Sequence, residues 1–201
     1  MNHPIIRDII PNHAMKYKEE LMKEIFFTML LKDAYRKGDF TLSSGKKSEH
    51  YINCKPVILS AKGCIMASLL LLEEIDDDAV SVGGLTLGAD PLVTGVSCAS
   101  YYQNKIVDAL IIRKEPKGHG TASQVEGKLP PKGSKVTVLE DVTTTGESSL
   151  KAVNVLRDLG YEVNTVVSIV DRQEGAVEGF KLHGIKSVSY THLTLPTICS
   201  V

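Results

Sequence analysis

Long apolar runs are missing from this chain. The longest, around residues 25–31 and 69–72, are too short to span a bilayer, and the N-terminal segment has no apolar core typical of a secretion signal. The formal net charge is only −1, so charge gives no reason to expect nucleic acid or a membrane as a partner. Because 201 residues suffice for one sizeable core, we expect a single domain over residues 1–201.

Paired cysteines and two common nucleotide-binding motifs are missing as well. The chain has four cysteines but no C-x-x-C pair, so we expect reduced thiols in a cytoplasmic protein. It contains no Gly-x-x-x-x-Gly-Lys-Ser/Thr run, which excludes the ATPase P-loop. It also contains no Gly-x-Gly-x-x-Gly after a strand, so the dinucleotide-binding fingerprint is absent.

Apolar strands alternate with helical patterns along the chain. The expected strands are residues 79–82, 108–112, 135–139 and 164–170. The expected helices are residues 18–35, 60–74, 91–102 and a helix after the threonine loop that carries Leu150, Val153, Leu156 and Leu159 on one side and ends before Gly160. Shorter strands are expected near residues 40–45 and 51–53. This alternation predicts a parallel sheet with helices on both faces, in which ligands bind beyond the carboxyl ends of the strands. The unusual loops follow such ends, after Val82, Ile112, Leu139 and Val170.

The most informative segment is Lys135–Ser149. An apolar strand ends in Glu140 and Asp141, a loop of threonines around Gly146 follows, and a helix then begins. The hydroxyls, the backbone N–H groups and the positive end of the helix dipole can hold a phosphate. The two acids can hold ribose hydroxyls or, through water, a metal ion. The arrangement suits a phosphorylated sugar, and the alternative is an ordinary strand, turn and helix with a threonine as N-cap.

Two further loops contain residues that could bind an anionic ligand. Gly83–Gly88 follows a strand, and its glycines would let backbone amides approach an anion, although a plain tight turn explains them as well. Arg113–Gly120 places three cations and a histidine at the start of a long polar stretch. Pyrophosphate is a good partner for these cations, and such a loop can close over a site. The alternative is a solvated basic loop.

These segments resemble a known family. Lys135–Ser149 is similar to the phosphoribosyl-pyrophosphate (PRPP) motif of type I phosphoribosyltransferases, and the R-K-x-x-K-x-H spacing from Arg113 resembles the catalytic loop of orotate phosphoribosyltransferases. Residues 40–45 with Ser48 and Tyr51 resemble the substrate segment of that family, and residues 171–174 resemble its orotate-binding strand end. The resemblance covers residues 16–188 and leaves 189–201 as an atypical tail. It implies the type I phosphoribosyltransferase fold: α/β, a central mostly parallel sheet flanked by helices, a small N-terminal hood and a long flexible loop.

The resemblance also implies an activity. The protein would be a glycosyltransferase (a pentosyltransferase) that transfers the phosphoribosyl group of PRPP to orotate, giving orotidine 5′-monophosphate and pyrophosphate in pyrimidine (UMP) biosynthesis. One alternative is a purine or uracil phosphoribosyltransferase, against which Arg172 and the basic loop argue. A second alternative is a non-catalytic, nucleotide-sensing regulator of the same fold, and the intact acids Glu140 and Asp141 argue against it.

Residue roles follow from the resemblance by position. It assigns catalysis to Lys117, Asp141 and His119, and orotate binding to Thr144 and Arg172. It assigns PRPP binding to two groups of residues, Arg113, Lys114, Lys117 and His119 in the basic loop and Glu140, Asp141, Val142, Thr143, Thr144, Thr145, Gly146, Glu147 and Ser148 after the strand. Mg²⁺ is the implied cofactor, held through PRPP and water and not directly by protein side chains. A homodimer is implied, with the Arg113–Gly120 loop reaching the partner's site.

Some positions depart from the family pattern or stay open. Ser43 and Leu87 stand where some members carry lysine, and Arg172 could instead form an ion pair with Asp171 or Glu174. By resemblance, a cis peptide is expected between residues 85 and 86, and the acidic run 76–78 is expected to be a solvated turn. Pro196 and the β-branched residues of the tail oppose a helix there, and we assign the tail no function.

Overall fold

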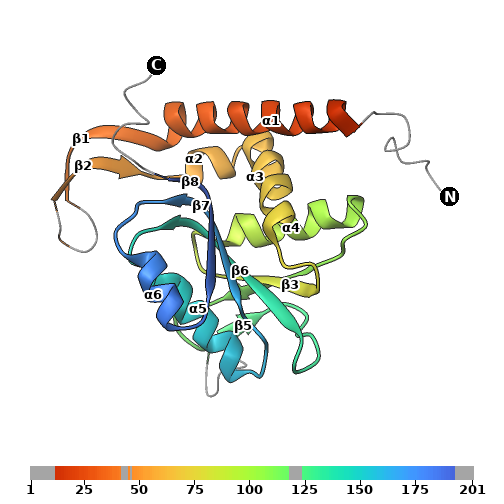
Figure 1. Ribbon diagram of the computed structural model, residues 1–201. Coiled ribbons are helices and arrows are strands. Elements are labelled where there is room, and N and C mark those ends of the chain that lie inside the picture. Colours follow the sequence, from red (N-terminus) through yellow and green to blue (C-terminus); the bar gives the residue numbers. More distant parts are fainter. Residues whose placement is uncertain (1–11, 42–44, 46, 118–123, 193–201) are drawn as a thin grey trace.

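Six strands form the central sheet of the computed structural model, which describes residues 12–41, 45, 47–117 and 124–192 (Figure 1). Their order across the sheet is β5 (Val125–Glu126), β4 (Asp108–Ile112), β3 (Ala79–Leu85), β6 (Lys135–Thr143), β7 (Thr165–Asp171) and β8 (Lys186–His192). Neighbours run parallel except β4 and β5, which are antiparallel. The expected mostly parallel α/β sheet is confirmed.

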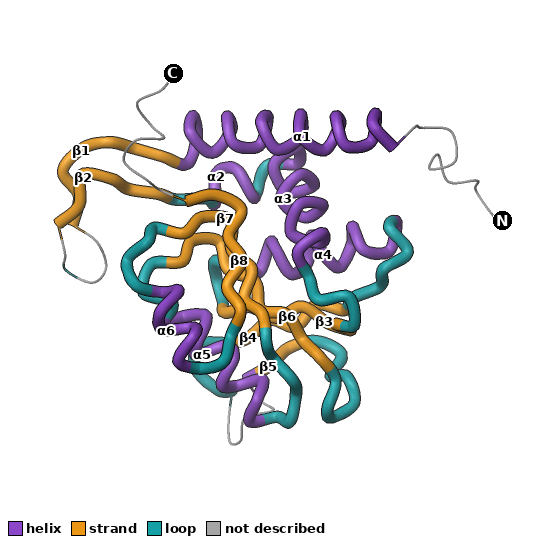
Figure 2. Tube along the Cα trace, viewed as in Figure 1, coloured by secondary structure: helices purple, strands orange, loops and turns teal. Residues whose placement is uncertain are grey.

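Helices cover both faces of this sheet (Figures 1 and 2). One face packs against α3 (Ala61–Glu74) and α4 (Asp90–Tyr102), with α1 (Asn12–Met29) and the short α2 (Lys55–Ile58) beside them. The other face packs against α5 (Glu147–Asp158) and α6 (Ala176–Leu182). Because β7 lies between these two layers, all seven of its residues are buried, as a strand covered on both faces requires.

A two-stranded hairpin forms the small N-terminal hood. The antiparallel strands β1 (Tyr35–Thr41) and β2 (Lys47–Ile52) pair Tyr35 with Ile52, and the rings of Phe40 and Tyr51 stack with centroids 5.3 Å apart. The helix predicted over residues 18–35 instead begins at Asn12 and ends in a π-helical turn, Leu30–Ala34, from which β1 starts directly. Pairing across the hairpin, which local sequence does not reveal, sets this boundary.

Two elements near the C-terminal end were not predicted, the seven-residue helix α6 and the edge strand β8. β8 pairs in parallel with β7, and the hydroxyls of Ser189 and Ser168 lie 2.9 Å apart. Tyr190 packs edge-on against Phe26 of α1 with ring centroids 5.7 Å apart. The tail that begins at residue 189 therefore starts inside the sheet, while residues 193–201 lie outside the described part of the chain.

The acidic turn 76–78 ties together the amino ends of the central strands. Asp76 accepts hydrogen bonds from the hydroxyls of Thr165 (2.9 Å) and Thr137 (3.4 Å). Asp77 and Asp78 are exposed, and each forms an ion pair, with Lys105 and Lys135 respectively. The expectation of a merely solvated turn is therefore wrong for Asp76.

None of the described helices combines the length and the apolar character that a membrane span requires.

Candidate active site

A pocket of about 720 Å³ opens where β6 and β7 end beneath the hood. Its wall contains the whole segment 140–149, which includes every residue predicted to bind a ligand after the signature strand. Arg172 and Glu174 line it from the end of β7, and residues 41, 51–53 and 55 line it from the hairpin and α2. The residues predicted after the signature strand therefore lie together in one pocket at the carboxyl edge of the sheet, and their binding roles stay predictions.

Two buried acids stand at the end of β6. Glu140 is 6% exposed and accepts a hydrogen bond from the Ser149 hydroxyl at 3.0 Å. Asp141 is 8% exposed, accepts the N–H of Val142 at 2.9 Å and forms an ion pair with Lys55, whose Nζ lies 3.5 Å from Oδ2. Burial, with the Asp141 charge beside it, raises the pKa of Glu140 from an ordinary 4.5 to about 8.

The threonine loop leads into α5 without a side-chain cap. Gly146 is the N-cap residue, and no side chain caps the first N–H groups of α5, so the expected alternative of a threonine N-cap is wrong. Gly146 has φ +80°, and a Cβ there would lie 2.9 Å from Cζ of Phe180 in α6. The buried hydroxyl of Thr143 has no hydrogen-bond partner. Unpaired donors beside a helix N-terminus form a natural anion site.

Arg172 is held at the mouth of β7 and faces the pocket. Its Nη2 lies 3.0 Å from Oε1 of Glu174 and donates to the Ser48 hydroxyl at 3.2 Å. The expected ion-pair alternative is thus confirmed for Glu174. The guanidinium can still donate a further hydrogen bond, because its buried Nε has no partner. An arginine that lines a pocket with a free donor is well suited to a carboxylate ligand.

Two of the three glycines in the segment 83–88 belong to the strand and not to the loop after it. β3 runs to Leu85, so Gly83 and Gly84 lie inside the strand, where a Cβ on Gly84 would come within 2.2 Å of the Ala89 Cβ. These two glycines allow close packing, and anion binding by the segment stays a prediction. Only Gly88 faces the site, since a Cβ there would lie 2.6 Å from Oδ1 of Asp141. The cis peptide lies between Thr86 and Leu87, one bond later than expected.

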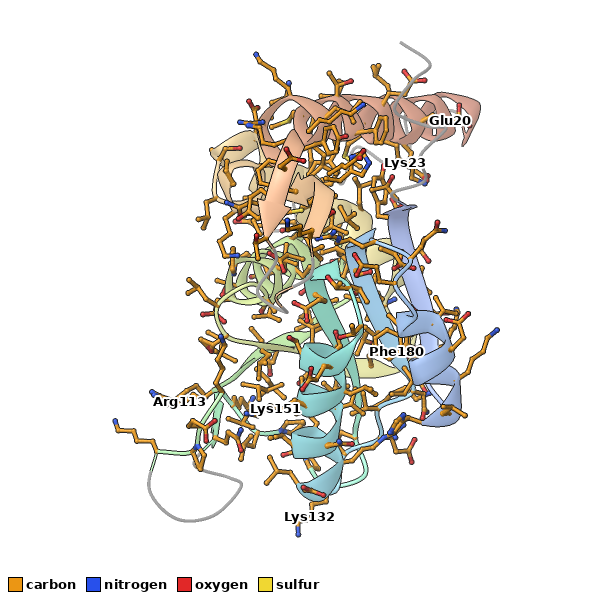
Figure 3. The ribbon with its side chains drawn as sticks, turned by 90° about the vertical axis from the view of Figure 1, so that its left-hand side faces the viewer. Glu20, Lys23, Arg113, Lys132, Lys151 and Phe180 are labelled. Carbon is orange, nitrogen blue, oxygen red and sulfur yellow. The ribbon has the colours of Figure 1, made fainter. Side chains whose placement is uncertain are left out.

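The described part of the basic loop, residues 113–117, does not line the pocket of its own chain. Arg113 pairs with Glu126, its Nη2 lying 2.7 Å from Oε1, and Lys114 and Lys117 are exposed, while none of the three lines the pocket. Glu115 pairs with Lys151 of α5 at 3.3 Å, which fixes the start of the loop beside that helix (Figure 3 labels Arg113 and Lys151). His119 lies outside the described residues. Arg113, Lys114 and Lys117 therefore lie apart from the predicted residues 140–148 that line the pocket.

Some pocket residues were not predicted, chiefly Lys55 and Ser149. Lys55 comes from α2, a helix of four residues that gives no periodic signal in the sequence. Ser149 lies just beyond the expected phosphate loop, and only the fold turns its hydroxyl back to Glu140. Within the described residues no cluster of three or more His, Cys, Asp or Glu could hold a metal ion. The carboxylates of Glu140 and Asp141 are the groups that could take part in binding one.

Relatives among characterised proteins decide between the possible phosphoribosyl chemistries. No protein-family model matches the chain. The orotate phosphoribosyltransferase of Thermosynechococcus vestitus is 56% identical over 164 residues, which are 82% of this chain and 87% of that protein. The chain belongs to the orotate phosphoribosyltransferase family. The expected family and enzyme class, a pentosyltransferase, are thereby confirmed over the purine and uracil alternatives.

Solved structures of orotate phosphoribosyltransferases share the fold. A Mycobacterium tuberculosis enzyme in complex with Fe(III) dicitrate superposes with a TM-score of 0.77 at 32% identity, covering 90% of this chain and 99% of that one. The same enzyme in complex with PRPP gives a TM-score of 0.71 at 31% identity, covering 86% and 96%. The expected type I phosphoribosyltransferase fold is confirmed.

Proposed function

We propose that this protein transfers the phosphoribosyl group of PRPP to orotate, giving orotidine 5′-monophosphate and pyrophosphate. One observation carries the proposal: a single pocket holds two buried acids, an uncapped helix N-terminus and a guanidinium with a free donor. These groups match the ribose, the 5′-phosphate and the orotate carboxylate in turn. The mycobacterial relative solved with PRPP supports the sugar donor.

Each part of the pocket takes one part of the substrates. The 5′-phosphate binds residues 142–148, where the Thr143 hydroxyl lacks a partner and the N-cap residue Gly146 offers no side-chain cap to α5. Glu140 and Asp141 accept hydrogen bonds from the ribose hydroxyls. Thr144 and Arg172 orient orotate, whose carboxylate pairs with the guanidinium. This places N1 of orotate against C1 of the ribose, which is the main way such a site lowers the barrier.

The reaction breaks the bond between C1 and the diphosphate oxygen and forms the bond between C1 and N1. The diphosphate leaves with the bonding electron pair, and the N1 proton of orotate passes to the departing diphosphate, directly or through water. Positive charge grows on the ribose in an oxocarbenium-like transition state, while negative charge grows on the leaving group. Lys117, His119, Arg113 and Lys114 stabilise that negative charge, which makes electrostatic stabilisation the main catalytic term.

Mg²⁺ fits this pocket as a companion of PRPP. Two adjacent carboxylates, Glu140 and Asp141, face the pocket. Mg²⁺ commonly binds through one or two carboxylates, water and substrate phosphates. When bound, the ion supplies charge that neutralises the diphosphate. The residues of the chain do the remaining work, since they bind the sugar, orient the base and exclude water.

A homodimer completes the site, because Arg113, Lys114 and Lys117 lie outside the pocket of their own chain. An apolar groove of about 780 Å³ adjoins the pocket at Lys55 and runs between α2, α3 and α4. Leu59, Ile65 and Leu87 line it and are 67%, 49% and 64% exposed. A second copy seated on this groove would remove these side chains from water.

The cysteines described, Cys54, Cys64 and Cys98, are free thiols, in keeping with a cytoplasmic protein.

An assay of base specificity tests the proposed function. Protein, Mg²⁺ and PRPP are mixed separately with orotate, uracil, adenine and hypoxanthine, and the loss of each base and the release of pyrophosphate are followed. We expect only orotate to be consumed, with one pyrophosphate released for each base. Consumption of another base in its place contradicts the proposal. Binding of PRPP without turnover of any base indicates a regulator instead.

A further inference from the structure

Among the described residues, Lys55 is the cation that forms an ion pair with one of the two acids at the end of β6. Its Nζ lies 3.5 Å from Oδ2 of Asp141, and its side chain is 40% exposed. Asn53, just before it, fixes the start of α2, because its Oδ1 accepts the N–H of Lys55 at 3.2 Å. The neighbouring Cys54 is fully buried, with its Sγ 3.9 Å from the Asp141 carbonyl oxygen. The backbone of Lys55 is thus anchored on the end of β6, while its long side chain keeps room to move.

The pocket has few cations for a substrate with phosphates at both ends. Of the described residues that line it, Glu140, Asp141, Glu147 and Glu174 are acidic and only Lys55 and Arg172 are basic. Arg172 is paired with Glu174 at the far, β7 side of the pocket. Lys55 is therefore the positive charge that this chain itself supplies on the side of Asp141.

The position of Lys55 points toward the leaving group. Lys55 lines both the main pocket and the apolar groove, and Leu87 lines that groove too. Gly88, the next residue, lies against the carboxylate of Asp141. Lys55 thus stands between the acid that holds the ribose and the Thr86–Ala89 loop. Leu87 offers no charge in that loop.

We infer that Lys55 binds the diphosphate of PRPP from within the same subunit. The inference rests on the proposed function. In the free protein the ammonium group pairs with Asp141. When the ribose hydroxyls occupy that carboxylate, the flexible side chain turns to the diphosphate oxygens at C1. A lysine is suited to this, because it acts as a point charge on a long stem and needs no fixed geometry. The ammonium group of Lys55 thus exchanges Asp141 for the diphosphate, and its positive charge stays in the site.

The test compares ligands with and without a diphosphate. Lys55→Met and Lys55→Arg are prepared with Lys62→Met as the matched control, since Lys62 is exposed on α3 and lines neither cavity. Binding of PRPP, inorganic pyrophosphate and orotidine 5′-monophosphate is measured with Mg²⁺ by calorimetry. Lys55→Met is expected to weaken PRPP and pyrophosphate about ten- to hundredfold, the range of a lost charge-assisted contact. Orotidine 5′-monophosphate, which has no diphosphate, should change by about twofold at most.

The variants separate a diphosphate contact from a structural role. If Lys55 only holds Asp141 in place, Lys55→Met weakens all three ligands alike, and the inference is wrong. Unchanged pyrophosphate binding also overturns it. Lys55→Arg keeps the charge and should retain most of the PRPP affinity, and Lys62→Met should bind like the unmodified protein. Failure of the unmodified protein to bind PRPP would instead refute the proposed function, and this inference with it.

Discussion

At the scale of single residues, the burial of Glu140 in the site lowers the stability of the folded protein. Its carboxyl is buried beside a second acid, and the hydrogen bond from Ser149 offsets only part of that cost. The pKa of Glu140 therefore rises from 4.5 to about 8. Between these values the folded protein keeps a proton on Glu140 that the unfolded chain releases. Because the folded state then binds more protons, its stability falls as the pH rises through this window.

Replacing Glu140 by glutamine should remove that pH dependence. Glutamine keeps the shape and can still accept from Ser149, but it carries no charge. The free energy of unfolding of Glu140→Gln should exceed that of the unmodified protein by about 1–3 kcal/mol near pH 9, and the difference should shrink toward zero near pH 5. Urea unfolding at several pH values measures it. Glu147→Gln, which removes an exposed charge from the same loop, is the control. An excess stability of Glu140→Gln that is constant with pH would contradict the raised pKa.

Individual site residues were predictable where they are contiguous in sequence. Residues 140–148 form one uninterrupted segment after a strand, so a pattern of acids, hydroxyls and glycine sufficed to find them. Arg172 followed from its place at the end of the next strand. Lys55 and Ser149 had no such signal, because their roles depend on Asp141 and Glu140, which lie 86 and 9 residues away along the chain. Such contacts exist only once the chain has folded.

At the scale of elements, the junction between the threonine loop and α5 depends on α6. Gly146 has φ +80°, a left-handed conformation, and its α-carbon faces the ring of Phe180. Phe180, which Figure 3 labels, is fully buried, so its ring has little room to move. The end of α5 that is proposed to bind phosphate is therefore shaped by a helix that contributes no residue to the pocket wall.

An alanine at position 146 should disrupt both stability and phosphate binding. The added Cβ would lie 2.9 Å from Phe180 Cζ in a backbone conformation that alanine adopts at a cost. We expect Gly146→Ala to lose about 2–4 kcal/mol of unfolding free energy and to bind PRPP more weakly. Chemical unfolding and calorimetry measure the two effects. Gly175→Ala is the matched control, because Gly175 has φ +98° with nothing within 4 Å of its Cβ position. An equal loss in both variants would mean that the contact with Phe180 contributes nothing.

Elements with strong internal periodicity were predicted well, and those defined by tertiary pairing were not. The predicted helix 60–74 and strand 108–112 match α3 and β4 within one residue. α6 has only seven residues, too few for a clear helical repeat, and β8 is an edge strand with alternating polar side chains. The first helix begins at Asn12, six residues before its predicted start, while the end of its π-helical turn at Ala34 lies within one residue of the prediction.

At the scale of the whole molecule, the sequence placed all ligand-binding loops at one edge of the sheet, but it could not tell which loops share a pocket. The loop after β6 and the end of β7 meet in one cavity, whereas Arg113, Lys114 and Lys117 remain outside it. Both groups follow strands that end at the same edge. The start of the basic loop instead carries two exposed ion pairs, Arg113 with Glu126 and Glu115 with Lys151. Linear sequence does not reveal such a division.

Lys117 should be needed for turnover and dispensable for folding. Its side chain is exposed, so Lys117→Ala removes no core contact. Loss of one charge that stabilises the leaving diphosphate is expected to lower kcat about a hundredfold or more. Steady-state kinetics with orotate and PRPP measures the loss, and the melting temperature should stay unchanged. Near-normal turnover would rule out a role in the chemical step.

Mixing two inactive variants tests whether the basic loop serves the partner's site. Lys117→Ala damages the loop and Arg172→Ala damages the pocket, so each homodimer should be nearly inactive. In a mixed dimer one site combines an intact pocket with an intact loop from the other subunit. Random exchange at equal amounts should therefore restore about one quarter of the normal activity. Mixing Lys117→Ala with Lys114→Ala, which damages both loops, should restore none. If the first mixture gives only the sum of two residual activities, the loop acts within its own subunit.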